Sequence, residues 1–249
     1  LQQMRLGGIF DHIGLGFHRY STDKKWFLPH FEKMLYDQAM NSMAYLEAYH
    51  ITKNKKYAEI AEEIFSYVLR DMRHEKGGFF SAEDADSEGE EGTFYLWKEQ
   101  ELFKVLGKKD GSVISKVYGF SKNGNFHDEA SGKRNGGNIP FLSKSKSILA
   151  KEIKIDLDDL NNIIECSRKK LFEKRKERVH PLKDDKILTD WNGLMIASLA
   201  HGGMVLNNEQ YIKEAINAAD FIHEHLQRND GRLVKRYRQG HSGLDPCIN

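Results

Sequence analysis

Cysteine and proline are scarce in this chain of 249 residues, which has two cysteines and four prolines. Cys166 and Cys247 cannot build a disulfide framework, and the chain has neither a CxxC pair nor the cysteine and histidine spacing of a zinc site. We therefore expect a folded protein of a reducing compartment, with cytoplasmic localisation and with no metal or other cofactor.

Long apolar segments and net charge are also lacking. No stretch approaches the ~20 apolar residues that span a bilayer, and no secretory signal pattern stands at the N-terminus. The 38 basic and 37 acidic residues nearly cancel, which disfavours a polyanionic partner. The composition thus predicts no membrane partner and no nucleic-acid partner.

The most distinctive stretch is residues 7–37, which reads GGIFDHIGLGFHRYSTDKKWFLPHFEKMLYD. It combines four glycines with three histidines, several carboxylates and many aromatic residues. A loop that carries so many titratable groups directly ahead of a helix is a common place for binding and catalysis.

Helical periodicity dominates the rest of the chain. Apolar residues at steps of three and four predict helices over about 29–52, 55–74, 98–106, 111–118, 153–176, 190–206 and 209–228. Pro29 suits the first turn of the predicted helix 29–52. The backbone N–H that proline lacks would have no hydrogen-bond partner within the helix at that position. In that helix His30, Lys33 and Asp37 would share one polar face.

Residues 77–97, GGFFSAEDADSEGEEGTFYLW, place six acids between two aromatic segments and predict a β-hairpin with an acidic loop. The acids match several positions of an EF-hand loop, but Tyr95 stands where the bidentate glutamate belongs. A looser calcium site and a hydrogen-bonded loop that braces Arg19 or His18 are the alternatives, and the second is favoured.

A repeat links the two ends of the chain. Tyr57 precedes Gly77 by the same twenty residues that separate Tyr211 from Gly231. In both copies a polar turn leads into a helix, and the glycine ends the helix before a β-type segment. The pattern predicts an all-α fold in which helical hairpins form an array or toroid, each burying one face against the next.

Three segments, residues 7–37, 77–97 and 184–200, resemble the signature segments of the thioredoxin-domain-containing family that includes the spermatogenesis-associated proteins. The resemblance implies an (α/α) toroid similar to those of six-hairpin glycosidases and N-acylglucosamine 2-epimerases, with a thioredoxin-like domain elsewhere in the intact protein. Leu15 departs from the family pattern, which usually has a glycine there. Because the family continues into further hairpins, we expect residues 1–249 to form one domain, an incomplete (α/α)6 barrel from a longer protein.

A toroid of this kind surrounds a central cavity, and a sugar needs aromatic stacking and dense hydrogen bonding there. Glycoside hydrolysis requires two carboxyl groups ~5–9 Å apart, whereas epimerisation or isomerisation requires an acid and a base that suit histidine. The predicted catalytic residues are His30, Asp37, Asp86 and Asp185. The predicted substrate-binding residues are His12, His18, Arg19, Trp26, Tyr36, Asp84, Trp97, Trp191 and Asn192.

Structural roles are the alternative for each candidate. The three histidines of residues 7–37 could bind a ligand, or they could form hydrogen bonds to the loop backbone instead. Asp37 also fits a helix surface or an ion pair with Arg19, and packing is the favoured role of Trp191 and Asn192.

The predicted function is a carbohydrate-processing enzyme domain, either a sugar epimerase or isomerase or a glycosidase-like enzyme, that acts on a sugar or glycoside. The alternative is a non-catalytic helical binding module that works with the thioredoxin-like domain.

Overall fold

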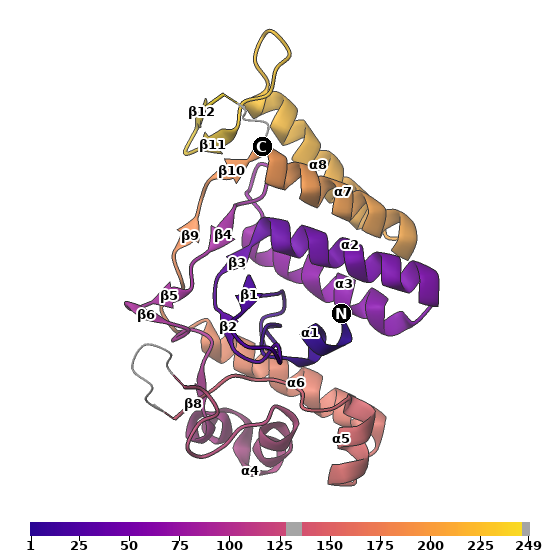
Figure 1. The fold of residues 1–249 in the computed structure, drawn as a ribbon, viewed down its shortest axis with the longest axis vertical. Helices are drawn as coiled ribbons and strands as arrows, with labels where there is room; N and C mark the ends of the chain where they lie inside the picture. The colour runs from indigo at the N-terminus through magenta and orange to yellow at the C-terminus, as the bar shows by residue number, and fades with distance from the viewer. Residues whose placement is uncertain (128–135, 246–249) are drawn as a thin grey trace. The chain divides into compact units, whose positions relative to one another are not determined.

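A computed structural model describes residues 1–127 and 136–245 (Figure 1). The chain divides into two compact units that alternate along the sequence: residues 1–31 and 85–181 form unit 1, and residues 32–84 and 182–249 form unit 2. The single domain expected from the sequence stays a prediction, and Cys247 lies outside the described residues.

Unit 1 is mainly helical, and its strands are short ribbons of two residues each. Its elements in the described residues are α1 (Gln2–Leu6), β1 (Tyr20–Ser21), β2 (Pro29–His30), β5 (Asp86–Ser87), β6 (Glu90–Glu91), β7 (Trp97–Lys98), α4 (Glu99–Val117), β8 (Gly137–Asn138), α5 (Lys146–Ile153) and α6 (Leu157–Arg175). Helices α4 and α5 both pack on α6 over a core that includes Trp97, Ile114 and Leu171.

Two sequence features set the helix limits in unit 1. Helix α4 joins the predicted helices 98–106 and 111–118 across a kink at Gly107, whose φ of 74° only glycine adopts readily. The predicted helix 153–176 is α6 preceded by a separate α5. Asp156 caps α6, and its side chain accepts a hydrogen bond from the backbone N–H of Asp158 at 2.8 Å.

Unit 2 contains the longest run of packed helices. Its elements are β3 (Lys33–Met34), α2 (Leu35–Thr52), α3 (Lys55–Tyr67) with a π-helical turn η1 (Val68–Met72), β4 (Ala82–Glu83), β9 (Lys183–Asp184), β10 (Ile187–Leu188), α7 (Thr189–Leu206), α8 (Glu209–Leu226), β11 (Arg236–Arg238) and β12 (His241–Gly243). Helix α2 packs on α3 and α7, and α7 packs on α8 (Figure 1). The predicted all-α array of helical hairpins with short β segments is confirmed.

Small residues allow the close approach of α2 and α7. Ser42 Oγ of α2 and Ser198 Oγ of α7 lie 2.6 Å apart and are buried. A Cβ atom on Gly202 would come within 2.5 Å of the Phe65 ring, so a larger residue there would force the packed helices apart.

The predicted repeat is confirmed, and it extends over whole modules. Each module is a strand, two antiparallel helices and a returning strand: β3-α2-α3-β4 in the first and β10-α7-α8-β11 in the second. Every one of these elements begins in the second module 154 residues after its counterpart, the offset between Gly77 and Gly231 (231 minus 77).

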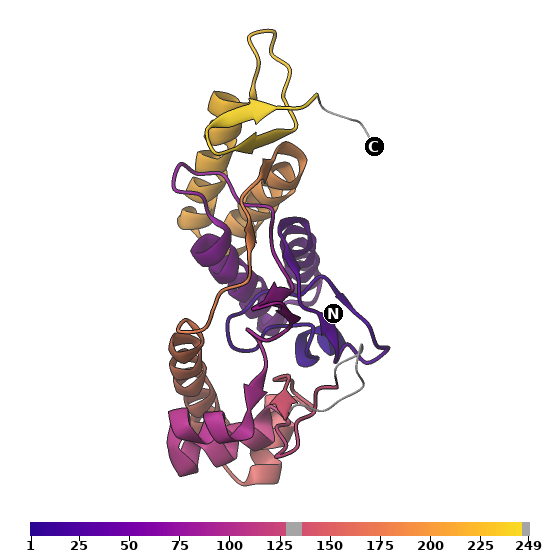
Figure 2. The same ribbon diagram turned by 90° about the vertical axis from the view of Figure 1, so that its left-hand side faces the viewer.

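Local chemistry in the two modules matches in detail. Lys53 and Asn207 end the first helix of each module in the left-handed region, and the asparagine that follows caps the second helix. Backbone hydrogen bonds from Leu35 to Ser81 and from Thr189 to Lys235 then close each module. In the second module β11 continues into β12, and Figure 2 shows this yellow ribbon beside α8.

The predicted start of the first helix at Pro29 is wrong. Pro29 and His30 form β2, which pairs with β1, and Lys33 lies in β3, so helix α2 begins only at Leu35. The apolar spacing from Phe31 to Leu35 continues the helical period through a non-helical segment, which misplaced the boundary. His30, Lys33 and Asp37 therefore do not share a helix face.

The predicted hairpin between residues 79–80 and 94–97 is also wrong. The strand after α3 is β4, which pairs with β3 and β9. A tighter hairpin, β5–β6, lies within the acidic stretch, with Glu88 and Gly89 in its turn at φ values of 57° and 82°. Two positive φ values match the right-handed twist of short hairpins, and Gly89 adopts one without strain.

No helix in residues 1–127 or 136–245 is both long and apolar enough to cross a membrane. In the same residues no group of three or more histidine, cysteine, aspartate or glutamate side chains is placed to hold a metal ion.

The two repeat glycines offer a matched test of the module turns. A Cβ atom on Gly77, at φ 116°, would lie 2.6 Å from the Asn217 carbonyl oxygen, whereas one on Gly231, at φ 84°, would meet no atom within 4 Å. We expect Gly231→Ala to lower the free energy of unfolding by about 1 kcal/mol, through backbone strain alone, and Gly77→Ala to lower it by clearly more. Urea unfolding of both variants measures the difference, and equal losses would contradict it.

Candidate functional site

The β1–β2 hairpin of unit 1 carries the predicted residue His30. Tyr20 faces His30 in the strand register, and the loop between the strands is ordered by Asp23, whose carboxylate accepts hydrogen bonds from the backbone N–H groups of Lys25, Phe27 and Leu28. Partial burial acts to raise the pKa of Asp23, but these hydrogen bonds outweigh it and lower the pKa below its usual value.

His30 forms an oriented acid–base pair with Glu91, which the β5–β6 hairpin supplies. His30 Nδ1 donates to Glu91 Oε1 at 2.7 Å, and the same oxygen accepts the backbone N–H of Phe31 at 3.2 Å. Because a carboxylate only accepts hydrogen bonds, Nδ1 carries the proton of this contact, and the pair fixes the orientation of the ring. The Tyr20 ring stacks on His30 with 4.9 Å between centroids, and the His30 side chain is 25% exposed.

The other two histidines of residues 7–37 are buried. His12 Nδ1 accepts from Arg5 Nη1 at 3.1 Å, and Nε2 donates to the Gly7 carbonyl at 3.0 Å. His18 Nδ1 donates to the Phe31 carbonyl at 3.0 Å, and its ring lies against Tyr95 with 4.7 Å between centroids. Both rings thus hydrogen-bond within the protein, and their predicted ligand-binding roles stay predictions.

A buried ion pair fixes the glycine-rich loop to α6. Arg175 donates to both carboxylate oxygens of Asp11, at 3.0 and 2.7 Å, and Asp11 also accepts the backbone N–H groups of Ile13 and Gly14. A Cβ atom on Gly14 would lie 1.9 Å from Arg175 Nη2, so this glycine makes room for the guanidinium. Neither residue was predicted, because 164 positions separate them in sequence.

The other predicted site residues of unit 1 differ in their exposure and contacts. Asp86 lies opposite Glu91 in the β5–β6 register and is exposed, as is Arg19. Trp26 is 38% exposed at a positive φ of 61°. Trp97 is fully buried, and the Arg178 guanidinium lies 4.1 Å from its ring centroid, which indicates a packing role.

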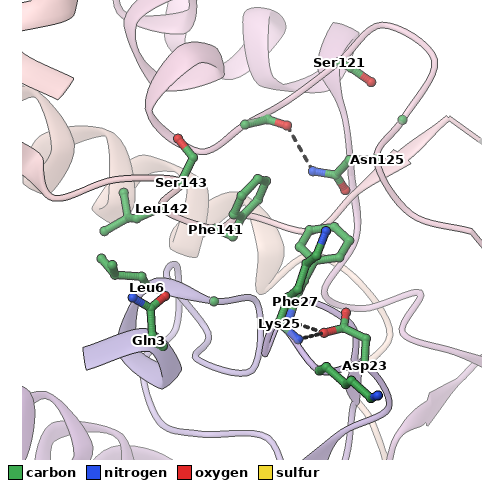
Figure 3. Close-up of a pocket in the computed structure, with 14 residues that line it drawn as sticks. Gln3, Leu6, Asp23, Lys25, Phe27, Ser121, Asn125, Phe141, Leu142 and Ser143 are labelled. Carbon is green, nitrogen blue, oxygen red and sulfur yellow. Dashed lines mark hydrogen bonds between the residues drawn. The ribbon is translucent and has the colours of Figure 1, made fainter. Parts of the chain in front are cut away.

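Unit 1 also contains an open pocket of about 860 Å³ that includes none of the predicted site residues (Figure 3). The rings of Phe27 and Phe141 meet edge to face in it, 5.0 Å apart. Lys25 and Asp23 stand on one side, and Asn125 on the other donates to the carbonyls of Gly119 and Ile139. Its size suits a small molecule.

In unit 2 the helix starts bring several candidates together. Tyr36 and Trp191 meet edge to face with 4.7 Å between centroids, and Asp37 lies in the first turn of α2. Asn192 is buried and exchanges two hydrogen bonds with the Phe79 backbone, so it fastens the returning chain to α7.

Asp84 and Asp185 lie on exposed or partly exposed segments of unit 2. Asp84 donates its backbone N–H to the Leu182 carbonyl at 2.9 Å, and its side chain is exposed. The Asp185 carboxylate holds Arg238 and accepts from Gln239 Nε2 at 3.1 Å. Their predicted roles in substrate binding and catalysis stay predictions.

A buried polar cluster at the β3–β4–β9 sheet was not predicted. Lys33, Glu83 and Lys183 face one another across the three strands, and Lys33 and Glu83 are 1% and 5% exposed. Tyr67 Oη donates to Glu83 Oε2 at 2.7 Å, while Lys33 Nζ lies 4.4 Å from the centroid of the Tyr67 ring. No local signal in the sequence points to this cluster, because Lys33 falls in the predicted helix 29–52 and Glu83 in the predicted acidic loop.

The chain is similar to several known proteins. No family model matches it. It is 38% identical to human spermatogenesis-associated protein 20 over 261 residues, which cover 98% of this chain and 33% of that protein. The chain is similar in sequence to spermatogenesis-associated protein 20. An uncharacterised protein of Caenorhabditis elegans is 32% identical over 260 residues, covering 98% of this chain and 35% of that protein.

The chain spans about a third of the length of spermatogenesis-associated protein 20 and its nematode relative. Among solved structures, cellobiose 2-epimerase of Bacillus thermoamylovorans is 12% identical with a TM-score of 0.28, over 95% of this chain and 72% of that one. D-Mannose isomerase is 14% identical with a TM-score of 0.29, over 90% and 49%. Such scores carry no argument about function, and the helical class rests on the chain's own elements.

The buried ring of His12 predicts a pH dependence of stability. Burial, reinforced by the positive charge of Arg5, lowers the pKa of His12 from 6.5 to about 3. Between these values the unfolded chain binds a proton that the folded chain lacks, so stability falls as pH decreases through this window. From pH 7.5 to pH 5 this group should remove about 2 kcal/mol from the free energy of unfolding.

Urea unfolding at pH 7.5 and pH 5 measures the effect. His12→Gln keeps a donor and an acceptor but cannot titrate, so its free energy of unfolding should change less between the two pH values. The exposed His50, changed to Gln, is the control that should leave the pH dependence as it is. Identical pH dependence in His12→Gln and the wild type would refute the buried neutral ring.

Proposed function

We propose that the chain is the helical part of a carbohydrate-processing enzyme, an aldose–ketose isomerase or a sugar 2-epimerase in which His30 is the acid–base residue. The observation that carries the proposal is the pair of His30 and Glu91 beside the Tyr20 ring. The sequence resemblance to a family with an expected α/α toroid supports the substrate class, and the activity of the intact protein belongs to the same proposal.

The pair suits the removal of a proton from a carbon next to a carbonyl group. Nε2 of His30 would take the proton at C2 of an open-chain sugar, and the negative charge of Glu91 would stabilise the imidazolium that forms. Return of the proton to C1, while the O2 hydroxyl loses its proton and O1 gains one, moves the carbonyl to C2 and gives the ketose from an aldose. Return to the opposite face of C2 gives the epimer and needs a second acid.

Tyr20 adds a surface for the sugar itself. Its ring is 48% exposed while it stacks on His30, so its outer part offers an apolar platform to the C–H face of a sugar. Among the carboxylates, Asp185 holds Arg238, and Asp86 lies opposite Glu91 in a surface hairpin. The histidine pair is therefore the feature from which we infer isomerisation or epimerisation, with glycoside hydrolysis as the alternative reaction.

Proton exchange with solvent tests the proposal directly. The full-length protein that contains this chain would be incubated in D2O with D-mannose, D-fructose, D-glucose and cellobiose, and deuterium at C1 and C2 followed by proton NMR. We expect the wild type to exchange at least one sugar, and His30→Gln to exchange it about 100-fold more slowly, because the base is lost.

His50→Gln, an exposed change on α2, should keep full activity and serves as the matched control. Unchanged exchange in His30→Gln would sink the role of His30. If the wild type exchanged none of the sugars, the enzyme proposal would fail and the non-catalytic binding module would replace it. The cytoplasmic location and the thioredoxin-like domain of the intact protein stay predictions.

A further inference from the structure

The two modules of unit 2 differ at one set of buried positions. The strand before the first helix carries Lys33 in the first module and Ile187 in the second. The second helix carries Tyr67 at the position of Phe221, and the returning strand carries Glu83 at the position of Tyr237. Each pair is separated by the same 154 residues as Gly77 and Gly231 (231 minus 77), so the positions correspond.

The second module shows what the fold itself requires at these positions. Ile187, Phe221 and Tyr237 are buried in one apolar cluster, and the rings of Phe221 and Tyr237 meet edge to face 5.1 Å apart. Ile187 and Tyr237 are paired across β10 and β11, as Lys33 and Glu83 are across β3 and β4. Packed apolar side chains therefore suffice to hold a module of this design together.

The first module places charges in the same backbone positions. Lys33 and Glu83 are almost fully buried, and Tyr67 Oη donates to Glu83 Oε2 at 2.7 Å. Removing two charges from water costs several kcal/mol each, and the attraction between them often fails to offset this cost. An apolar set that fits the same positions is therefore expected to be at least as stable.

The polar set also has a route to solvent. Lys183 of β9 faces Glu83 from the strand opposite Lys33, and its Nζ lies 3.8 Å from Glu83 Oε1. The Lys183 side chain is 37% exposed, so the row of charges across the sheet ends at the protein surface. The Glu83 side chain is 7% exposed, so a ligand would reach its carboxylate by displacing Lys183, whose Nζ also donates to the Asp71 carbonyl.

We propose that Lys33, Tyr67 and Glu83 form a binding site for a polar small molecule that bears hydroxyl or carbonyl groups, with Lys183 at its entrance. Glu83 accepts hydrogen bonds from the ligand, and the Tyr67 hydroxyl holds its carboxylate in position, with Lys33 in the paired strand beside the Tyr67 ring. The site is present in the first module only, because the second fills the same positions with core residues. Only the choice of a sugar as ligand rests on the function proposed above.

Replacing the polar set by its counterparts tests the site. In the full-length protein, Lys33→Ile, Tyr67→Phe and Glu83→Tyr would be combined, so that the first module carries the side chains of the second. We expect the melting temperature to stay the same or rise, and deuterium exchange into the sugar to fall by about 100-fold or more. Tyr237→Phe, a change confined to the second module, is the control and should leave exchange unchanged.

Glu83→Gln provides a second variant, because it keeps the size of the side chain and an oxygen for Tyr67 while removing the charge. It should lose sugar binding, measured by calorimetry, while its melting temperature stays close to that of the wild type. A triple variant that melts far below the wild type, or that exchanges sugar at the wild-type rate, would overturn the inference.

The two proposals fail in different ways. If the wild type binds and exchanges no sugar, the proposed enzyme function falls, and the melting temperature of the triple variant still decides the role of the cluster. A higher melting temperature would then support a site for another polar ligand, and a lower one would show that the cluster holds the fold. If His30→Gln keeps wild-type activity while the triple variant loses it, the role proposed for His30 fails and the proposal for the cluster stands.

Discussion

Pairing between strands of two or three residues is the constraint on which unit 2 depends. In each module the strand ahead of the first helix pairs with the strand behind the second, as β3 does with β4 and β10 with β11. This pairing returns the chain to its starting point after two helices and fixes where the first helix of each module begins. The helix starts, with Tyr36, Asp37 and Trp191, are held at these positions by backbone hydrogen bonds, so their side chains are presented from a rigid base.

Unit 1 relies on a different device, since its N-terminal loop has little regular structure. The Asp11–Arg175 pair ties that loop to α6 and receives backbone hydrogen bonds that leave no carboxylate oxygen unused. Breaking one partner of such a pair leaves a buried charge, which is far more damaging than losing the attraction itself. The positions of His12 and His18 follow from this anchor, because both lie on the loop that it holds.

Local patterns in the sequence predicted the helical hairpins. Contacts between residues far apart in the sequence could not be predicted in this way. Tyr57 and Gly77 with Tyr211 and Gly231 revealed the repeat because turn and stop signals act within a few residues. His30 was identified as a candidate by its setting, yet its partner Glu91 is 61 positions away, and no local signal connects them. The predicted start of α2 was wrong for the same reason. Strands β2 and β3 form by pairing with β1 and β4, which lie outside residues 29–34.

A constant offset between two modules, with no insertion or deletion in either, is the pattern expected from duplication of one βααβ segment. After duplication, one copy can keep the side chains that stabilise the architecture while the other diverges. The second module then serves as an internal reference state within the same molecule. Positions of the first module, such as Asp37, can be compared with their counterparts in the second, here Trp191, without a second protein.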